Sequence, residues 1–550
     1  MRAAILMTLS AAWIISLLLT WWWPPFRWFL WIMALLSVVA LYDILQTRHA
    51  LWRNFPIIGR GRWVMEFFRP FLRQYFFESE TSGVPINRMF RSVIYQRAKG
   101  EMDSLPYGTR LDTRALGYEW IGHSLSAIHY DRSAKAPRVI IGGPDCQQPY
   151  AASIFNISAM SFGALSANAI RALNLGAKQG NFYHNTGEGS VSPYHLEHGG
   201  DLVWQIGTGY FGCRDNEGRF DPDAFATTAK LPSVKMIEIK LSQGAKPGHG
   251  GILPADKNTA EIARIRLVEP GTRVDSPPAH SSFHTPLQMV KFIAQLRELS
   301  GGKPIGFKLC IGRKSEFVGI CKAIHETGIL PDFITVDGGE GGTGAAPLEY
   351  SNSVGMPLSD ALVFVTDTLT GFGLRKHIKV IASGKTFTGF HLVKHFALGA
   401  DVCNSARGMM VALGCVQSLV CNTNECPTGI ATQDQSLAKG LVVSNKAQRV
   451  CRYHGETVHA TMDIISSAGL RNPSQLNRSH VFRRVTETEV KRLDEIYPSV
   501  AEGCLLRDDY PDCFSQAMSE SSAHYFTPAK YIIECYSGLE EMPEDHERVS

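Results

Sequence analysis

The chain has 550 residues, of which 45% are apolar and 19% charged, and its formal net charge is +4 at pH 7. This composition excludes a disordered chain, and so small a charge excludes the dominant basic field of nucleic-acid-binding proteins, so we predict no nucleic acid partner. One hydrophobic core rarely extends over this many residues, so we expect two or more structural units.

The first predicted element is a hairpin of two apolar transmembrane helices over residues 1–47. The stretch from Ala3 to Phe26 has no charged residue, and a second apolar run extends from Trp28 to about Leu45. Each is close to the roughly 20 residues that cross a hydrocarbon core. Arginines follow the second run, so the positive-inside rule predicts a multi-pass anchor in the cell inner membrane with the catalytic body in the cytoplasm. A cleaved signal peptide is the alternative. The arginines are Arg48, Arg53, Arg60, Arg62, Arg69 and Arg73.

Residues 48–135 mix aromatic and basic residues, and we interpret them as a juxtamembrane segment that leads into the main domain. From there, over residues 136–470, short apolar runs alternate with segments whose apolar residues recur at helical spacing. Alternating strands and helices predict a parallel sheet, and strand ends rich in glycine and charge favour a (β/α)8 TIM barrel over a doubly wound open sheet. Residues 471–550 are predicted to be a helical tail. The apolar runs are residues 139–143, 236–241, 305–310, 333–339 and 380–385.

Glycine-rich turns follow several of the predicted strands. The densest is DGGEGGTGAAP at 337–347, and two others are SGKTFTG at 383–389 and NSARGMM at 404–410. Barrels bind phosphate after their last two strands with backbone amides and a helix N-terminus, so these turns favour a phosphorylated ligand over mobile surface loops. Lys308 at another strand end adds a positive charge, which beside a flavin would stabilise the anionic reduced ring. A strand-end ion pair is the alternative for Lys308.

Three cysteines, Cys415, Cys421 and Cys426, fall within twelve positions. Their spacing differs from the Cys-x2-Cys pairs of zinc sites and is closer to iron–sulfur ligation. Three thiolates suit a three-iron cluster. A fourth ligand from Cys403 or Cys451 would give a four-iron cluster or a zinc ion instead, and unpaired core cysteines are the remaining alternative.

Several motifs between about residues 150 and 435 occur in one order, which is far more specific than any single motif. With them the chain resembles the FMN-binding synthase domain of glutamate synthase, and in particular the stand-alone, membrane-anchored members of that family without a glutaminase domain. The resemblance implies a (β/α)8 barrel with FMN and a 3Fe-4S cluster. The motifs are ISAMSFGALSANAI (157–170), NTGEG (185–189), LSQGAKPGHGGILP (241–254), SPPAH (276–280), DGGEGGTGAAPL (337–348), SGKTFTG (383–389) and GCVQSLVCNTNECPTGIATQ (414–433).

The resemblance also implies a role for individual residues. The three clustered cysteines are expected to bind the cluster. Residues expected to contact the flavin or its phosphate are Met160, Ser161, Gly163, Lys308, Gly384, Lys385, Ser405 and Ala406. Residues expected to bind the oxoacid or act in catalysis are Glu188, Lys246 and Arg266.

Two positions depart from the family pattern. Ile252 stands where the family has a glutamine, and His249 stands where an acidic residue is usual. An isoleucine side chain cannot donate a hydrogen bond to a carboxylate or keto group, and a site that loses a donor can strongly reject its former ligand. The identity of the oxoacid is therefore open.

The leading functional prediction is an oxidoreductase that reduces the imine of a 2-oxoacid, with 2-oxoglutarate and ammonia giving glutamate. Ammonia is expected from solution or a partner, and electrons from a ferredoxin-like protein or a reductase subunit. A second prediction reverses the flow: an amino acid or other small carboxylate is oxidised and a quinone in the membrane accepts the electrons. A non-catalytic membrane scaffold is the third.

Overall fold

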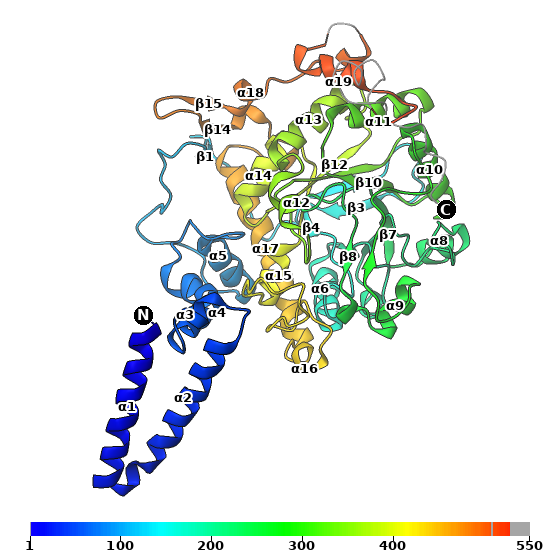
Figure 1. The fold of residues 1–550 in the computed structure, drawn as a ribbon. Coiled ribbons are helices and arrows are strands. Elements are labelled where there is room, and N and C mark those ends of the chain that lie inside the picture. Colours follow the sequence, from blue (N-terminus) through cyan, green and yellow to red (C-terminus); the bar gives the residue numbers. More distant parts are fainter. Residues whose placement is uncertain (1, 508–509, 528–550) are drawn as a thin grey trace, which may run out of the picture. The chain divides into compact units, whose positions relative to one another are not determined.

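The structure is a computed structural model that describes residues 2–507 and 510–527. It divides into two compact units, Met1–Arg88 and Met89–Ser550, which Figure 1 shows in sequence colours. The last part of the predicted tail, residues 528–550, lies outside the described residues.

The first unit begins with two long apolar helices, α1 (Arg2–Trp22) and α2 (Arg27–Leu45), joined by the turn η1 (Pro24–Phe26). Length and composition allow both to cross a membrane, although a signal sequence near an N-terminus passes the same test. They lie side by side (Figure 1), and Trp13 Nε1 donates to Ser37 Oγ across them at 2.8 Å. The elements that follow are α3 (Ala50–Asn54), η2 (Ile58–Arg60), α4 (Gly61–Leu72) and the π-helical turn η3 (Arg73–Phe77).

Eight parallel strands of the second unit close into a barrel, and they follow one another around it in chain order. This confirms the predicted (β/α)8 fold and excludes the doubly wound sheet. The strands are short and almost entirely buried, as expected for strands covered by helices on the outside and packed side chains on the inside. They are β4 (Phe155–Ile157), β5 (His184–Asn185), β6 (Leu202–Ile206), β7 (Val234–Lys240), β10 (Ile305–Leu309), β11 (Phe333–Asp337), β12 (Lys379–Ser383) and β13 (Val402–Ser405).

The apolar run at 139–143 is not one of the barrel strands. It forms β2 (Arg138–Ile141), which pairs antiparallel with β3 (Tyr150–Ser153) in a separate two-stranded sheet. Apolar side chains of this hairpin join apolar side chains from the first halves of the barrel strands in one buried cluster, so the hairpin closes the amino-terminal end of the barrel. The cluster contains Ile141, Tyr150, Ala152, Tyr183, Val203, Met236, Phe333, Ile381 and Val402.

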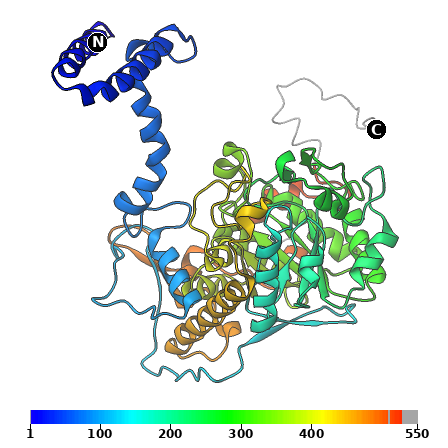
Figure 2. The same cartoon turned by 90° about the horizontal axis from the view of Figure 1, so that it is seen from below.

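Helices surround the strands (Figures 1 and 2). Several begin at a side-chain cap: Ser166 Oγ accepts from the Ala169 amide, and Thr285 Oγ1 accepts from the Gln288 amide. The long α17, gold in Figure 2, packs against α6 and α14. The helices are α6 (Ala167–Gly180), α7 (Pro193–Leu196), α8 (Pro222–Ala229), α10 (Pro286–Leu299), α11 (Lys314–Thr327), α13 (Leu358–Gly371), α14 (Gly389–Ala397) and α17 (Val443–Ser467).

Insertions after three strands enlarge the carboxyl end of the barrel. Functional sites of such barrels gather at this end because the loops that follow the strands meet there. After β7 come β8 (Ile252–Leu253), η4 (Ala255–Lys257), α9 (Ala260–Arg266) and β9 (Val274–Asp275); after β11 comes α12 (Leu348–Ser353); after β13 come α15 (Arg407–Leu413), the cysteine loop (residues 414–433) and α16 (Gln435–Ala438).

The remaining elements lie outside the barrel. The segment before it contributes α5 (Arg88–Lys99) and β1 (Glu119–Ile121), and β1 pairs with β14 in a three-stranded antiparallel sheet. The described part of the tail therefore contains strands as well as short helices. Its elements are η5 (Pro473–Gln475), η6 (Arg478–His480), β14 (Val481–Arg484), β15 (Val490–Arg492), α18 (Leu493–Ile496), η7 (Cys504–Leu506), η8 (Asp512–Phe514) and α19 (Ser515–Glu520).

Candidate active site

Charged side chains line the inside of the barrel towards its carboxyl end. Glu238 and Lys240 lie two residues apart on β7, Lys308 lies on β10 and Asp337 ends β11, and all four are buried. Side chains of a strand alternate between its two faces, so residues two apart share the inner face. Lys308 Nζ lies 3.2 Å from Asp337 Oδ2, so the strand-end ion pair anticipated for Lys308 is present.

Glu238 is held by three neighbours from three other strands. Its Oε1 accepts from Asn185 Nδ2 at 2.8 Å and from Gln205 Nε2 at 2.6 Å, and its Oε2 accepts from Thr335 Oγ1 at 2.6 Å. A buried carboxylate needs such partners, because a charge without them is expensive to bury. These hydrogen bonds hold the Glu238 carboxylate in place inside the barrel, below the carboxyl end where a ligand would bind.

Lys308 stays charged despite its burial. Burial alone disfavours the ammonium form, but the negative charges of Asp337 and Glu238 raise the pKa of Lys308 above its ordinary value. Asp337 Oδ2 also accepts from the Gly244 amide at 2.8 Å, which ties the loop after β7 to the end of β11. A fixed positive charge therefore lies at the mouth of the barrel.

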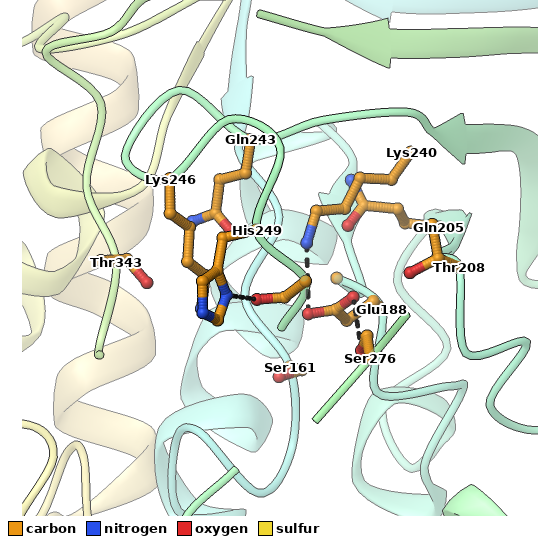
Figure 3. A network of polar contacts seen from close by, with 12 residues as sticks. Ser161, Glu188, Gln205, Thr208, Lys240, Gln243, Lys246, His249, Ser276 and Thr343 are labelled. Atoms are coloured by element: carbon orange, nitrogen blue, oxygen red, sulfur yellow. Dashed lines mark hydrogen bonds and ion pairs between the residues drawn. The ribbon is translucent and has the colours of Figure 1, made fainter. Parts of the chain in front are cut away.

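Glu188 lies in the loop after β5; Figure 3 shows it with Lys240 and Lys246, and the charge of Arg266 also acts on it. Its Oε1 is 3.2 Å from Lys240 Nζ, and its Oε2 accepts from Ser276 Oγ at 3.4 Å. Burial by itself would raise the pKa of Glu188, but Lys240, Arg266 and Lys246 together hold it below its ordinary value. Glu188 is therefore ionised at neutral pH, and its salt bridge to Lys240 fixes its carboxylate.

Two glycines make room for the Glu188 carboxylate. A Cβ on Gly207 would lie 2.6 Å from Glu188 Oε2, and a Cβ on Gly251 would overlap Glu188 Oε1. Any side chain at Gly251 would therefore displace the carboxylate from Lys240. The GHGG sequence before Ile252 thus has a steric function in this site.

Lys246 lies in the loop after β7 and is almost fully buried. Its Nζ donates to the Ala345 carbonyl at 2.9 Å. Within the described residues it has no carboxylate partner in an ion pair. Burial and the nearby Lys240 charge lower the pKa of Lys246 to about 8, against the opposing effect of Glu188. Lys246 is a cation whose charge is only partly compensated.

Arg266 ends α9 and is buried against the loop that follows β4. Its Nη2 donates to the Phe162 carbonyl at 3.1 Å and lies 3.5 Å from Ser161 Oγ, and its Cζ lies 5.2 Å from the centre of the Phe211 ring. Burial lowers the pKa of Arg266 to about 10. Among the described residues its Nε has no hydrogen-bond acceptor, and its guanidinium has no ion-pair partner. The guanidinium therefore keeps donors available for an anionic ligand.

The turns after β12 and β13 bring two cations together. Gly384 and Lys385 have φ values of 150° and 42°, so both adopt conformations that few side-chain-bearing residues tolerate. Burial and the neighbouring Arg407 charge lower the pKa of Lys385. Arg407 Nη2 donates to the Glu340 carbonyl at 2.8 Å, and neither cation forms an ion pair within the described residues. An anion such as phosphate would compensate both charges.

Ser405 and Ala406 follow in the turn after β13. Ser405 Oγ donates to the Thr386 carbonyl at 2.6 Å, which ties the two turns together, and Ala406 is the residue before α15. Met160 and Gly163, with Ser161 between them, lie in the loop after β4; Gly163 has φ 102°, and a Cβ there would come within 3.0 Å of Arg266 Nη2. The predicted flavin residues thus line several strand ends of one barrel mouth.

The three clustered cysteines lie in the loop between α15 and α16. Burial raises the pKa of the Cys415 thiol to about 11, and burial and Cys426 raise the pKa of Cys421. Cys426 differs: burial opposes ionisation, but the Thr428 hydroxyl and backbone amides outweigh it and lower its pKa. Cys421 and Cys426 both act on the pKa of Cys415, so the three thiols share one neighbourhood.

Cys403 and Cys451 are the two candidates for a fourth ligand of the predicted cluster. Cys403 Sγ lies inside β13, 3.8 Å from His395 Nδ1, and Cys451 lies on α17, where its sulfur faces Gly180 of α6. Within the residues described, no three His, Cys, Asp or Glu side chains are grouped closely enough to hold a single metal ion. That finding concerns a mononuclear site such as zinc, because the thiolates around a cluster stand farther apart than those around one ion.

Lys257 links the cysteine loop to the loop after β4. It is buried, and its Nζ donates to the carbonyls of Cys421, Ala431 and Ala164 at 2.7, 2.8 and 3.3 Å. Gln433 Nε2 adds donations to the Gly163 and Leu165 carbonyls at 3.0 and 2.9 Å. The predicted cluster loop and the predicted flavin loop are therefore directly connected.

The two departures from the family pattern flank Gly251 in the chain. Ile252 is in β8 and pairs with Asp275 of β9, directly after Gly251. His249 lies on the same loop as Lys246 (Figure 3), and its Nδ1 is 3.0 Å from the Gly250 carbonyl oxygen. Both positions lie within two residues of Gly251, which abuts the Glu188 carboxylate.

Sequence reasoning missed five residues that the structure brings into the site. The missed signal was a charged residue inside an otherwise apolar strand: MIEIKL has two such charges, and FITVD ends in a third. Inside a barrel these positions face the interior. Arg407 lies in the NSARGMM motif but was not singled out there, and Lys257 lies in no motif that was recognised. The five are Lys240, Glu238, Asp337, Lys257 and Arg407.

Comparisons with known proteins agree with this arrangement. Residues 111–471 match the family described as the conserved region in glutamate synthase. The glutamate synthase large subunit-like protein YerD of Bacillus subtilis is 35% identical over 503 residues, which cover 84% of this chain and 95% of that protein. The archaeal glutamate synthase (NADPH) of Methanocaldococcus jannaschii is 32% identical over 321 residues, which cover 58% of this chain and 60% of that protein.

The family match covers about two-thirds of this chain. The match to the Bacillus protein covers nearly the whole length of that relative. Against the archaeal relative, the chain spans about three-fifths of that protein's length. The chain therefore belongs to the glutamate synthase family of oxidoreductases.

Proposed function

We propose that the chain is an FMN- and iron–sulfur-dependent oxidoreductase that reduces the imine of a 2-oxoacid to an amino acid, with 2-oxoglutarate and ammonia giving glutamate. The observation that carries this proposal is the set of cations around Glu188. Lys246 and Arg266 are buried, and neither has an ion-pair partner among the described residues. Two incompletely compensated cations suit a substrate with two carboxylates.

In this proposal the cations position the substrate. Arg266 binds one carboxylate through its unused donors, and Lys246 binds the other as an ammonium. Both are held by backbone carbonyls, Phe162 and Ala345 respectively, so little side-chain freedom remains to be lost on binding. Such positioning accounts for a large part of catalysis when two reactants must meet in one geometry.

Glu188 is proposed to orient the substrate nitrogen and to accept or return a proton from it. Lys240 fixes the carboxylate at 3.2 Å and favours its ionised form. A carboxylate is the form that accepts a proton, and contacts with Lys240 and Ser276 hold it on two sides. Lys240 is thus a positioning residue for Glu188.

The barrel mouth fits FMN, which when bound supplies hydride chemistry. Lys308 provides a fixed charge for the ring, and Lys385 and Arg407 provide two cations for the phosphate. The glycine-rich turns allow backbone amides to approach a phosphate. Met160, Ser161 and Gly163 are proposed to lie against the ring, with Gly384, Ser405 and Ala406 near the phosphate.

The cysteine loop fits a 3Fe-4S cluster, which when bound supplies one-electron transfer. Cys415, Cys421 and Cys426 are the proposed ligands. The lowered pKa of Cys426 favours the thiolate that a metal requires, and the buried Lys257 ammonium offsets part of the negative charge of a thiolate-bound cluster. Connection of the loop to Gly163 through Gln433 supports a short path between the two cofactors.

The proposed partners follow from these roles. Electrons come from a ferredoxin-like protein or a reductase subunit, and ammonia comes from solution or a partner. The hairpin of α1 and α2 is proposed to anchor the chain in the cell inner membrane with the barrel in the cytoplasm, because both helices have the required length and composition.

A second candidate function runs in the other direction: an amino acid or other small carboxylate is oxidised and a quinone accepts the electrons. The same two helices favour it, since soluble metabolites need no membrane anchor whereas quinones lie in the bilayer. Ile252 also favours it, because a changed donor set beside Glu188 is consistent with a changed substrate.

One experiment tests these proposals together. The protein is purified anaerobically, its flavin and iron are measured, and the reduced protein is mixed with 2-oxoglutarate and ammonium while flavin absorbance is followed. Rapid reoxidation that needs both reagents is expected for glutamate formation. Reoxidation by a quinone analogue alone, together with flavin reduction by an amino acid, would favour the second function. Absence of flavin and iron would contradict both and leave the scaffold.

A further inference from the structure

Helix α4 in the first unit has an apolar face that is exposed to solvent. Trp63, Phe67 and Phe71 recur every four residues, and Phe67 and Phe71 are 67% and 50% exposed. Val64, Phe68 and Leu72 form a parallel row beside them, also exposed. Residues three and four apart share a helix face, so these two rows form one apolar stripe.

The opposite face of α4 is polar and mainly basic. Arg62, Glu66, Arg69 and Arg73 are spaced by four, three and four residues, which puts them on one side of the helix. Glu66 lies between two of the arginines, 3.9 Å from Arg62 and 3.7 Å from Arg69. One carboxylate cannot neutralise three guanidinium groups, so the polar face keeps a positive charge.

The structure fixes where α4 begins relative to α2. Asp43 in the last turns of α2 is fully buried, and it accepts from Arg60 Nη2 at 2.6 Å and from the Ile57 amide at 2.9 Å. Arg60 is the residue before α4 and also lies over the Trp52 ring, with Cζ 4.4 Å from its centre. Trp52 in turn packs edge-on against Trp63 of α4 at 5.2 Å.

These contacts prevent α4 from continuing α2 as one apolar helix. Fifteen residues separate Leu45 from Gly61, and within them the chain is folded back so that Arg60 reaches Asp43. The start of α4 is therefore held beside the carboxyl end of α2, where a membrane helix of this length would leave the hydrocarbon core.

We propose that α4 and the turn η3 that follows lie in the membrane–water interface, with the apolar stripe in the lipid and the arginines at anionic phospholipid headgroups. The inference rests on the proposed membrane anchor. Amphipathic helices with aromatic residues on one face and arginines on the other bind at this depth. Tyr75, Phe76 and Phe77 of η3 continue the exposed aromatic surface.

A lipid surface fits this helix better than another protein. The stripe follows the membrane-length helices in the chain, four of its six residues are aromatic, and its polar edge is basic, which complements anionic headgroups. An α4 bound in this way would hold the juxtamembrane segment along the membrane surface instead of letting it extend into water.

Photo-crosslinking of the full-length protein in nanodiscs of phosphatidylcholine and phosphatidylglycerol tests the inference. Benzoylphenylalanine replaces Phe67 in one variant, Arg69 in a matched variant on the opposite face, and Ile14 of α1 in a third. Phe67 and Ile14 are exposed by more than half, so an aromatic replacement leaves no core disturbed. We expect lipid adducts at positions 67 and 14 and a much lower yield at position 69.

The three positions separate the two proposals. Lipid adducts at 14 with protein adducts, or none, at 67 would overturn the interfacial placement and leave the anchor intact. No lipid adduct at 14 would overturn the anchor itself. Among the lipids captured at 67, the ratio of phosphatidylglycerol to phosphatidylcholine should be about fivefold higher than in the disc, the factor that one arginine contributes near an anionic surface. No enrichment would contradict the role of the arginines.

Discussion

The two ends of the barrel differ in the side chains that line them: one end is apolar and the other is charged. At the amino-terminal end, the β2–β3 hairpin and the starts of the strands fill the interior with apolar side chains that contact one another. At the carboxyl end, the same strands present Glu238, Lys240, Lys308 and Asp337, and the insertion after β7 adds Lys246 and Arg266. The side chains of the amino-terminal end pack against one another and need no ligand. The carboxyl end contains cations without ion-pair partners among the described residues, an arrangement that suits anionic ligands.

This difference separates stability from function within one fold. Changes at the apolar end should alter the free energy of unfolding and leave turnover per folded molecule unchanged. Changes at the charged end should chiefly alter turnover or ligand binding, because functional sites are rarely optimised for stability.

The largest effect is expected for Glu188→Gln. The amide keeps the shape but loses the charge that compensates Lys240, Lys246 and Arg266, and it cannot accept a proton. Turnover should fall by about 10²–10⁴-fold, the range for loss of a general acid–base group. Single-turnover flavin reoxidation by 2-oxoglutarate and ammonium measures it.

The control for this change is Glu197→Gln, which breaks an exposed pair with Arg171 at 2.7 Å and should leave turnover unchanged. Equal turnover of Glu188→Gln and the unmodified protein would remove Glu188 from the chemistry. It would then be a residue that only holds its loop to Lys240.

The next effect concerns the apolar end. Ile141 and Ile140 are neighbours on β2; Ile141 is fully buried in the cluster, whereas Ile140 is 56% exposed. Ile141→Ala should lower the free energy of unfolding by about 2–5 kcal/mol, and Ile140→Ala by less than about 0.5 kcal/mol. Denaturant unfolding followed by intrinsic fluorescence measures both, and turnover per bound flavin should stay constant.

A smaller effect, limited to the cysteine loop, is expected for Lys257→Met. The thioether keeps much of the length but removes three donations to the carbonyls of Cys421, Ala431 and Ala164. Iron affinity should fall by about 10–100-fold, as for other groups that support metal ligands, and the reduction potential of any remaining cluster should fall because a nearby positive charge is lost. Iron analysis and redox titration measure these two quantities.

Lys322→Met is the matched control for Lys257→Met. Lys322 Nζ also donates to backbone carbonyls, those of Met518 and Ser521, but it does so on α11. If both variants lose iron equally, the loss reflects general destabilisation. If neither does, Lys257 does not support the cluster loop.

The sequence predicted the charged end through its motifs and the apolar end less well. The glycine turns and the cysteine spacing are local patterns, so their residues could be named without a fold. The run at 139–143 shows the limit: its apolar residues predict a strand, but only tertiary pairing with residues 150–153 shows that it closes the barrel instead of joining it. Local pattern does not specify which strands pair.

The residues missed at the carboxyl end also depend on tertiary contacts that local pattern does not show. Lys240 and Glu188 are 52 positions apart in the chain, and only barrel closure brings their side chains within 3.2 Å. Lys257 was part of no recognised motif, and its role depends on three carbonyls from distant loops. For Lys240 the only available signal was a charge inside an apolar strand. Such a charge marks a position but does not identify the residue that it pairs with.

The smallest expected effect is a dependence on pH, which can be compared between one lysine at each end of the barrel. Lys246 at the charged end and Lys303 at the start of β10 both have a pKa lowered to about 8, chiefly by burial. Lysine in an unfolded chain keeps its ordinary value of 10.5, so the unfolded state binds more protons between pH 8 and 10.5. For both residues the free energy of unfolding therefore rises with pH across that window and does not distinguish them.

Ligand binding does distinguish them. If protonated Lys246 binds a substrate carboxylate, the dissociation constant of 2-oxoglutarate should rise toward tenfold per pH unit above about 8, and Lys246→Met should bind weakly with this dependence removed. Lys303 donates to the Ala229 and Leu231 carbonyls, away from the mouth, so Lys303→Met should leave the whole profile unchanged. A profile that survives Lys246→Met would assign the titration to another group and remove Lys246 from the substrate clamp, because a lost contact cannot carry a pH dependence.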